Sequence, residues 1–149
     1  MEAVIFIGIQ GAGKSSFYQQ RFFHTHVRIN LDMLKTRRRE QLLIEACLKG
    51  QQPFVVDNTN VTIEARAKYI ALAREAGFSV IGYYFKTELD KALERNRQRT
   101  GRACIPDKGV LGTYKRLQLP QLSEGFDWLY YVEINEANEF VVKEWKDEV

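Results

Sequence analysis

The chain has 149 residues, of which 45% are hydrophobic and 28% are charged, and its formal net charge is +3. This length suits one domain with an ordinary hydrophobic core and is too short for two independent cores. The composition excludes a disordered or fibrous protein, and a net charge this small does not by itself indicate nucleic-acid binding. The sequence therefore predicts a single folded domain over residues 1–149.

The ends and the cysteines suggest no export or cross-linking. The apolar run at residues 3–7 has no basic leader and is too short for a signal peptide or a membrane span, so we expect a cytoplasmic protein without membrane association. Cys47 and Cys104 are far apart and show no CxxC spacing, which indicates neither a zinc site nor a disulfide framework. Arginines cluster at residues 37–39 and again at residues 95–102, and both clusters suit anionic ligands.

Strand-like and helix-like segments alternate along the chain. Apolar runs rich in β-branched and aromatic residues predict strands at residues 3–7, 27–29, 54–56, 78–85 and 128–134. Helical spacing predicts helices at residues 14–23, 34–49, 63–76, 89–99 and 109–119. This order predicts an α/β fold whose mostly parallel sheet is covered by helices on both faces. Residues 140–142 are a candidate for an additional edge strand.

Residues 8–15 read Gly-Ile-Gln-Gly-Ala-Gly-Lys-Ser and match the phosphate-loop pattern GxxxxGK[ST] at every fixed position. The segment lies between the first predicted strand and the first predicted helix, which argues against a chance glycine-rich turn. Backbone N–H groups of such a loop point at phosphate oxygens, and the helix N-terminus adds its positive end. We expect Lys14 to reach the β- and γ-phosphates and the Ser15 hydroxyl to bind Mg²⁺. The residues expected to contact the nucleotide phosphates are Gly11, Ala12, Gly13, Lys14, Ser15 and Ser16.

Two carboxylates follow predicted strands. Asp57 ends the strand at residues 54–56, and in a parallel sheet that edge also holds the phosphate loop, so Asp57 is a candidate ligand of Mg²⁺ or its water. The alternative is a capping or turn aspartate. Asp32 follows the weaker strand at residues 27–29 and is a candidate general base for an acceptor hydroxyl. Lys35 lies one helical turn later, where a cation would sit beside the acceptor; an N-cap aspartate and a surface lysine are an equally good interpretation.

Arg95 and Arg99 are four residues apart on the predicted helix at residues 89–99 and should share one face. A kinase benefits from an arginine that closes over the transferring phosphoryl group, because its planar fork grips phosphate oxygens in two places. A solvated basic helix paired with Glu88, Asp90 or Glu94 is the alternative.

Together these segments resemble the P-loop polynucleotide kinase family, whose members transfer the γ-phosphate of ATP to a 5′-hydroxyl of DNA or RNA. Besides the phosphate loop, the matching segments are Ile29-Asn30-Leu31-Asp32, Val56-Asp57-Asn58-Thr59-Asn60, Arg95-Asn96-Arg97-Gln98-Arg99, Ile105-Pro106, Tyr114-Lys115, Pro120 and Glu124-Gly125-Phe126. They span most of the chain.

The resemblance implies a three-layer P-loop kinase fold with five parallel strands and a helical lid over approximately residues 88–119. It also implies that Asp32 is the general base, Asp57 a second essential acid, Arg99 the lid arginine on the donor phosphates and Arg95 an auxiliary lid residue. The chain departs from the family at Lys35, where members usually carry arginine, and in the stretch between Asp32 and Asp57, which looks shorter than usual. A lysine offers a point charge but not a bidentate clamp, and a shorter stretch implies a smaller or more open acceptor site.

Three functions remain open at this point. The leading hypothesis is an ATP- and Mg²⁺-dependent kinase that phosphorylates the 5′-hydroxyl ends of nucleic acids. The second is a kinase with the same chemistry whose acceptor is a small metabolite, nucleoside or antibiotic hydroxyl. The third is a nucleotide-binding regulator that hydrolyses ATP slowly, against which Asp32 and the paired arginines argue.

Overall fold

The computed structural model describes residues 1–86, 88–99 and 105–146. Its centre is a six-stranded sheet in the order β2-β3-β1-β4-β5-β6. The strands are β1 (Glu2–Ile7), β2 (Val27–Ile29), β3 (Phe54–Val56), β4 (Ser79–Phe85), β5 (Trp128–Ile134) and β6 (Phe140–Glu144). Neighbours from β2 to β5 pair in parallel, whereas β6 pairs antiparallel with β5. The predicted mostly parallel sheet with five parallel strands is confirmed, and β6 is the additional edge strand expected at residues 140–142.

Helices cover both faces of this sheet. They are α1 (Lys14–Arg21), α2 (Leu31–Leu34), α3 (Arg37–Lys49), α4 (Ile63–Glu75), α5 (Leu89–Arg97) and α6 (Asp107–Arg116). Successive side chains of a strand point to opposite faces. On β1, Ile5 belongs to a core shared with Ile44 of α3 and Ile70 of α4, while Phe6 belongs to a second core shared with Phe17 of α1. The α/β three-layer fold is therefore built on a central strand that is buried on both faces.

The predicted helix at residues 34–49 is divided in two. α2 ends at Leu34, Lys35 has a φ of 75°, and α3 begins after Thr36. The Thr36 side chain accepts a hydrogen bond from the Arg39 N–H at 3.2 Å, which caps α3. A new helix therefore starts where the hydrophobic spacing alone predicted a continuous one.

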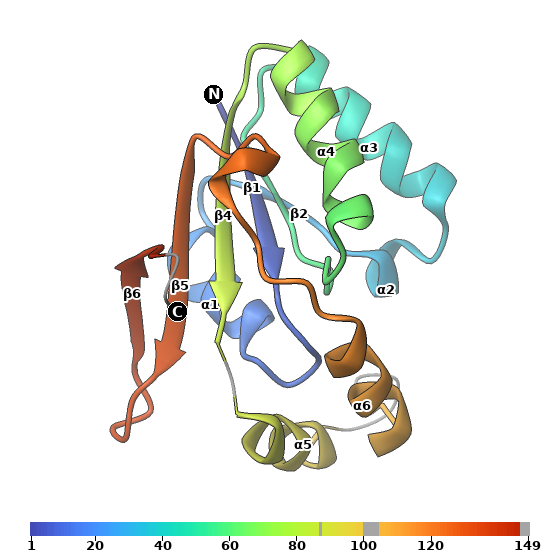
Figure 1. Cartoon of the computed structure of the whole chain (residues 1–149). Coiled ribbons are helices and arrows are strands. Elements are labelled where there is room, and N and C mark those ends of the chain that lie inside the picture. Colours follow the sequence, from blue (N-terminus) through green and yellow to red (C-terminus); the bar gives the residue numbers. More distant parts are fainter. Residues whose placement is uncertain (87, 100–104, 147–149) are drawn as a thin grey trace.

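α5 and α6 fall within the segment expected to form a lid and lie beyond the carboxyl ends of β1 and β4 (Figure 1). A small core of Ile9, Ala92 and Val110 joins them to the phosphate loop. Asn96, at the end of α5, is buried and binds the backbone of Ile105 through both its amide nitrogen and its amide oxygen. α5 and α6 are thus fastened to each other and to the loop.

A buried arginine of α4 binds the turn that follows β3. Arg66 of α4 is fully buried, and its guanidinium donates to both carboxylate oxygens of Glu124, at 2.8 and 3.1 Å, and to the carbonyl oxygen of Asn60 at 2.9 Å. This paired, hydrogen-bonded arginine fixes the turn that carries Asp57. Across the described residues, no helix is long and apolar enough to cross a bilayer.

Candidate active site

The phosphate loop joins β1 to α1 at the carboxyl end of the sheet. Gly11 and Gly13 have φ values of 80° and 94°, a backbone region that favours glycine. A Cβ added to Gly11 would lie 2.3 Å from the carbonyl oxygen of Ala92, so α5 packs directly on the loop. Gly13 is the N-cap residue of α1, whose first turn contains no acidic side chain. The N–H groups at this helix end are thus left to an anion.

Lys14 is buried at the base of the loop. Its Nζ donates to the carbonyl oxygens of Gly8 at 2.9 Å and Ile9 at 2.8 Å. Burial lowers the pKa of Lys14 to about 8, and the negative charges of Asp57 and Asp32 partly oppose this shift. Both carboxylates are therefore electrostatically coupled to the loop lysine.

Ser15, Asp57 and Arg28 form one hydrogen-bonded cluster. The Ser15 hydroxyl donates to Asp57 Oδ2 at 3.0 Å. Arg28 Nε donates to the same carboxylate oxygen at 2.8 Å, and Arg28 Nη2 donates to Ser15 Oγ at 3.0 Å. The strand end and the first turn of α1 thus meet here, as the sequence predicted for Ser15 and Asp57.

The donors of this cluster suit Mg²⁺. A hydroxyl and a carboxylate are hard oxygen ligands, which this ion prefers. Within the described ranges, no group of three or more His, Cys, Asp or Glu side chains could hold a metal ion. Mg²⁺ commonly binds through one or two protein ligands and takes the rest from water and phosphates. Ser15 and Asp57 therefore fit the predicted magnesium site.

Asp32 lies within α2 and lines the same cavity as Lys14. The N-cap of this helix is Asn30, whose side-chain oxygen accepts from the Met33 N–H at 2.9 Å. The capping interpretation of Asp32 is thus wrong, and its carboxylate is left for another role.

Contrary to the sequence prediction, Lys35 does not lie beside Asp32 on one helical face. Because α2 ends at Leu34 and Lys35 adopts a φ of 75°, helical spacing does not put Lys35 on the face of Asp32. Lys35 is exposed and is not among the residues that line the cavity. The predicted geometry of Lys35 is wrong because Thr36 starts a new helix.

Two cations that the sequence did not single out as site residues also line the cavity. The buried carboxylate of Glu40 accepts from Arg37 Nη1 at 3.1 Å, Tyr69 Oη at 2.9 Å and Asn58 Nδ2 at 3.1 Å, and lies 3.7 Å from Lys68 Nζ. The side chains of Arg37 and Lys68 are 61% and 46% exposed. One buried negative charge thus holds two cations at the cavity wall. Sequence reasoning missed Glu40 and Lys68, and it noted Arg37 only as part of a basic cluster.

Arg95 and Arg99 do not share one face. α5 ends at Arg97, so helical spacing does not extend to Arg99. Arg99 lines the cavity and lowers the pKa of Lys14 through its charge. Arg95 instead faces a separate hollow of about 230 Å³ beside Lys86 and Glu133, with Nη1 3.4 Å from the Gly11 carbonyl oxygen. The expectation that they project together is wrong.

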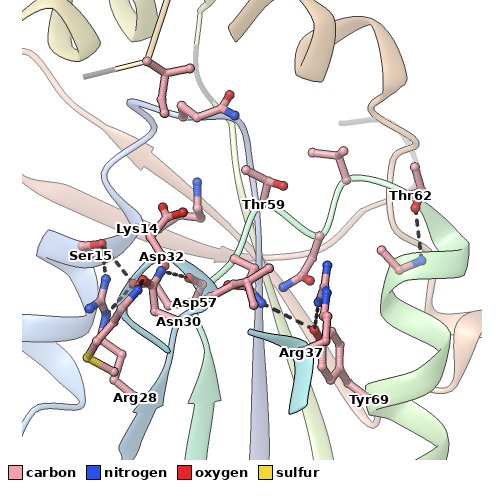
Figure 2. A pocket seen from close by; sticks show the side chains of 18 of the residues that line it. Lys14, Ser15, Arg28, Asn30, Asp32, Arg37, Asp57, Thr59, Thr62 and Tyr69 are labelled. Carbon is pink, nitrogen blue, oxygen red and sulfur yellow. Dashed lines mark hydrogen bonds and ion pairs between the residues drawn. The ribbon is translucent and has the colours of Figure 1, made fainter. Parts of the chain in front are cut away.

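The main cavity measures about 770 Å³ and brings the two halves of the predicted site together. Figure 2 shows Lys14, Ser15 and Asp57 close to Asp32, with Arg37 further along the wall. Of the predicted residues, Lys14, Ser15, Ser16, Asp32, Asp57 and Arg99 line this cavity, whereas Gly11, Ala12, Gly13, Lys35 and Arg95 are not in its lining. The cavity thus places a phosphate-binding loop opposite a carboxylate.

Comparison with known proteins identifies the family of the chain. Residues 4–120 match the family model described as "AAA domain". The chain belongs to the AAA domain family. The match indicates a P-loop kinase domain, and the phosphate loop of this chain lies within the matched residues.

Two curated relatives of this AAA domain are polynucleotide enzymes by name. The chain is 30% identical over 130 residues to the bifunctional polynucleotide phosphatase/kinase of Schizosaccharomyces pombe, covering 84% of this chain and 32% of that protein. It is 32% identical over 133 residues to a putative bifunctional polynucleotide phosphatase/kinase of Acanthamoeba polyphaga mimivirus, covering 85% and 32%. The chain thus spans about a third of the length of these relatives.

The fold is also found in a solved structure. Kti12 of Chaetomium thermophilum, determined in complex with ADP-AlF₃, superposes with a TM-score of 0.71 at 13% identity, covering 91% of this chain and 92% of that one. This likeness shows a shared P-loop fold.

Proposed function

We propose that this AAA domain is an ATP-dependent kinase that phosphorylates the 5′-hydroxyl of a DNA or RNA strand. The observation that carries the proposal is that Lys14 and Ser15 of the phosphate loop and Asp32 of α2 line one and the same cavity. The names of the two curated relatives support a polynucleotide acceptor.

The proposed reaction uses both sides of the cavity. The loop N–H groups and Lys14 hold the phosphates of ATP, and Arg99, which follows α5, adds positive charge. Asp32 accepts the proton of the acceptor hydroxyl while the oxygen forms its bond to the γ-phosphorus. The bond from the γ-phosphorus to the β-bridging oxygen breaks, and ADP leaves with that oxygen. When bound at Ser15 and Asp57, Mg²⁺ would neutralise charge on the phosphates.

The cations of the wall favour an acceptor that itself carries phosphate. Arg37, Lys68 and Arg116 line the cavity outside the loop. A nucleic-acid strand brings a backbone phosphate next to its terminal nucleoside, whereas a simple hydroxyl metabolite does not. Exposed cations held in place by Glu40 suit such a phosphate.

The test is transfer from γ-labelled ATP to DNA and RNA oligonucleotides that end in a 5′-hydroxyl. Identical oligonucleotides with a 5′-phosphate are the matched control, and nucleosides and sugars form a second panel. We expect label on the 5′-hydroxyl strands alone. Label on a small hydroxyl compound only would favour the alternative acceptor, and release of inorganic phosphate alone would favour a regulatory ATPase.

A further inference from the structure

Arg28 lies where the two proposed Mg²⁺ ligands face each other. Its Nε is 2.8 Å from Asp57 Oδ2 and its Nη2 is 3.0 Å from Ser15 Oγ (Figure 2). The Asp57 side chain is 1% exposed and that of Arg28 is 27% exposed. A guanidinium on the cavity side thus neutralises the buried carboxylate.

We infer that Arg28 competes with Mg²⁺ for the oxygens of Ser15 and Asp57. The inference rests on the proposed function, because that proposal places Mg²⁺ at Ser15 and Asp57. The phosphate-loop motif does not include Arg28, and the reasoning that led to Asp32 and Asp57 did not involve it either.

The competition follows from shared oxygens. Ser15 Oγ donates its proton to Asp57 and accepts from Arg28, so the guanidinium uses one of its two lone pairs. Mg²⁺ binds its oxygen ligands at about 2.0–2.1 Å. An ion this close to Ser15 Oγ would lie beside the guanidinium that holds the same oxygen, and the two positive charges repel. Close binding of Mg²⁺ therefore requires Arg28 to move.

Arg28 has room to move. It is on β2, an edge strand, and its side chain lines the cavity instead of either hydrophobic core. The guanidinium can turn into the cavity without opening the core. Nucleotide phosphates add oxygen ligands for the metal, so Mg²⁺ displaces Arg28 more readily together with ATP or ADP than alone.

The test is a titration of the nucleotide-free chain with Mn²⁺, followed by electron paramagnetic resonance of the free ion. The variants are Arg28→Ala and Arg28→Gln, and the matched control is Arg37→Ala, which removes the same charge from the same cavity but contacts neither Ser15 nor Asp57. We expect Mn²⁺ to bind the Arg28 variants at least about fivefold more tightly than the unaltered chain, as for a coupling of ordinary size. The control should bind Mn²⁺ as the unaltered chain does.

Circular dichroism identifies folded variants, and Arg28→Gln retains much of the side-chain volume if the alanine variant does not fold. Unchanged or weaker Mn²⁺ binding by a folded Arg28 variant overturns the inference, since Arg28 would then only support Asp57. An equal gain in Mn²⁺ affinity in Arg37→Ala also overturns the inference, because the effect would then come from the change in net charge. The titration contains no acceptor and does not measure phosphoryl transfer. A failed oligonucleotide assay would therefore contradict the proposed function but would not change the Mn²⁺ affinities.

Discussion

The side chain of Asn30 donates a hydrogen bond of 2.6 Å to the backbone carbonyl oxygen of Asp57. The same side chain caps α2 through its oxygen. One amide thus ties the helix that carries Asp32 to the strand end that carries Asp57.

Replacing Asn30 should therefore affect both stability and transfer. In Asn30→Ala the cap and the bond to Asp57 are lost, and we expect the free energy of unfolding to fall by about 1–3 kcal/mol in urea titrations. Single-turnover transfer should slow because Asp32 is no longer held, whereas ADP affinity should not change. Asn30→Asp keeps the capping oxygen but lacks the amide N–H that donates to Asp57. It should therefore be more stable than Asn30→Ala, while its transfer rate should stay low. A normal rate in Asn30→Ala would contradict this role.

The cations beside Glu40 should govern acceptor binding. We expect Arg37→Ala and Lys68→Ala each to raise KM for a 5′-hydroxyl oligonucleotide about tenfold, equivalent to about 1.4 kcal/mol, with kcat little changed. The salt dependence of binding should also weaken, because fewer phosphates are neutralised. Lys35→Ala is the matched control, since Lys35 lies outside the cavity lining, and it should have a small effect. A large effect of Lys35→Ala with normal Arg37 and Lys68 variants would reverse the assignment.

Nucleotide binding should depend on pH through Lys14. Burial lowers the pKa of Lys14 from 10.5 to about 8, and phosphates bind its charged form. Below pH 8 the ammonium is already charged; above it, binding must first take up a proton, so ADP affinity should fall by up to about tenfold per pH unit. Calorimetry at pH 9 in two buffers of different ionisation enthalpy measures the uptake. Lys14→Arg stays charged at pH 9 and should take up no proton when ADP binds. An absence of proton uptake in the unaltered chain would contradict this account.

The parts of the fold that the sequence predicted are those encoded locally. The phosphate loop requires glycine at positions with positive φ, as at Gly11 and Gly13, and β1 shows its burial in a continuous apolar run. Asp57 was predictable because parallel strands end at one edge of the sheet. The break at Lys35 also had a local signal, since Asn30 and Thr36 are both favoured N-cap residues.

The remaining features depend on packing between distant segments. Arg28 contacts Ser15 and Asp57 only because β2 lies beside β3 and faces α1, and no spacing in the sequence shows this. Glu40 reads as an ordinary exposed helix residue until α4 brings Tyr69 and Lys68 against it. The separation of Arg95 and Arg99 depends on where α5 ends.

The central claim is that one cavity holds a phosphate donor at Lys14 and an acceptor hydroxyl at Asp32. The most direct test compares Asp32→Asn with the unaltered chain in single-turnover transfer from γ-labelled ATP to a 5′-hydroxyl oligonucleotide, with ADP affinity measured in parallel. We predict that transfer falls by about 10²-fold or more, as for loss of a general base, while ADP affinity is retained. Normal transfer by Asp32→Asn would contradict the account.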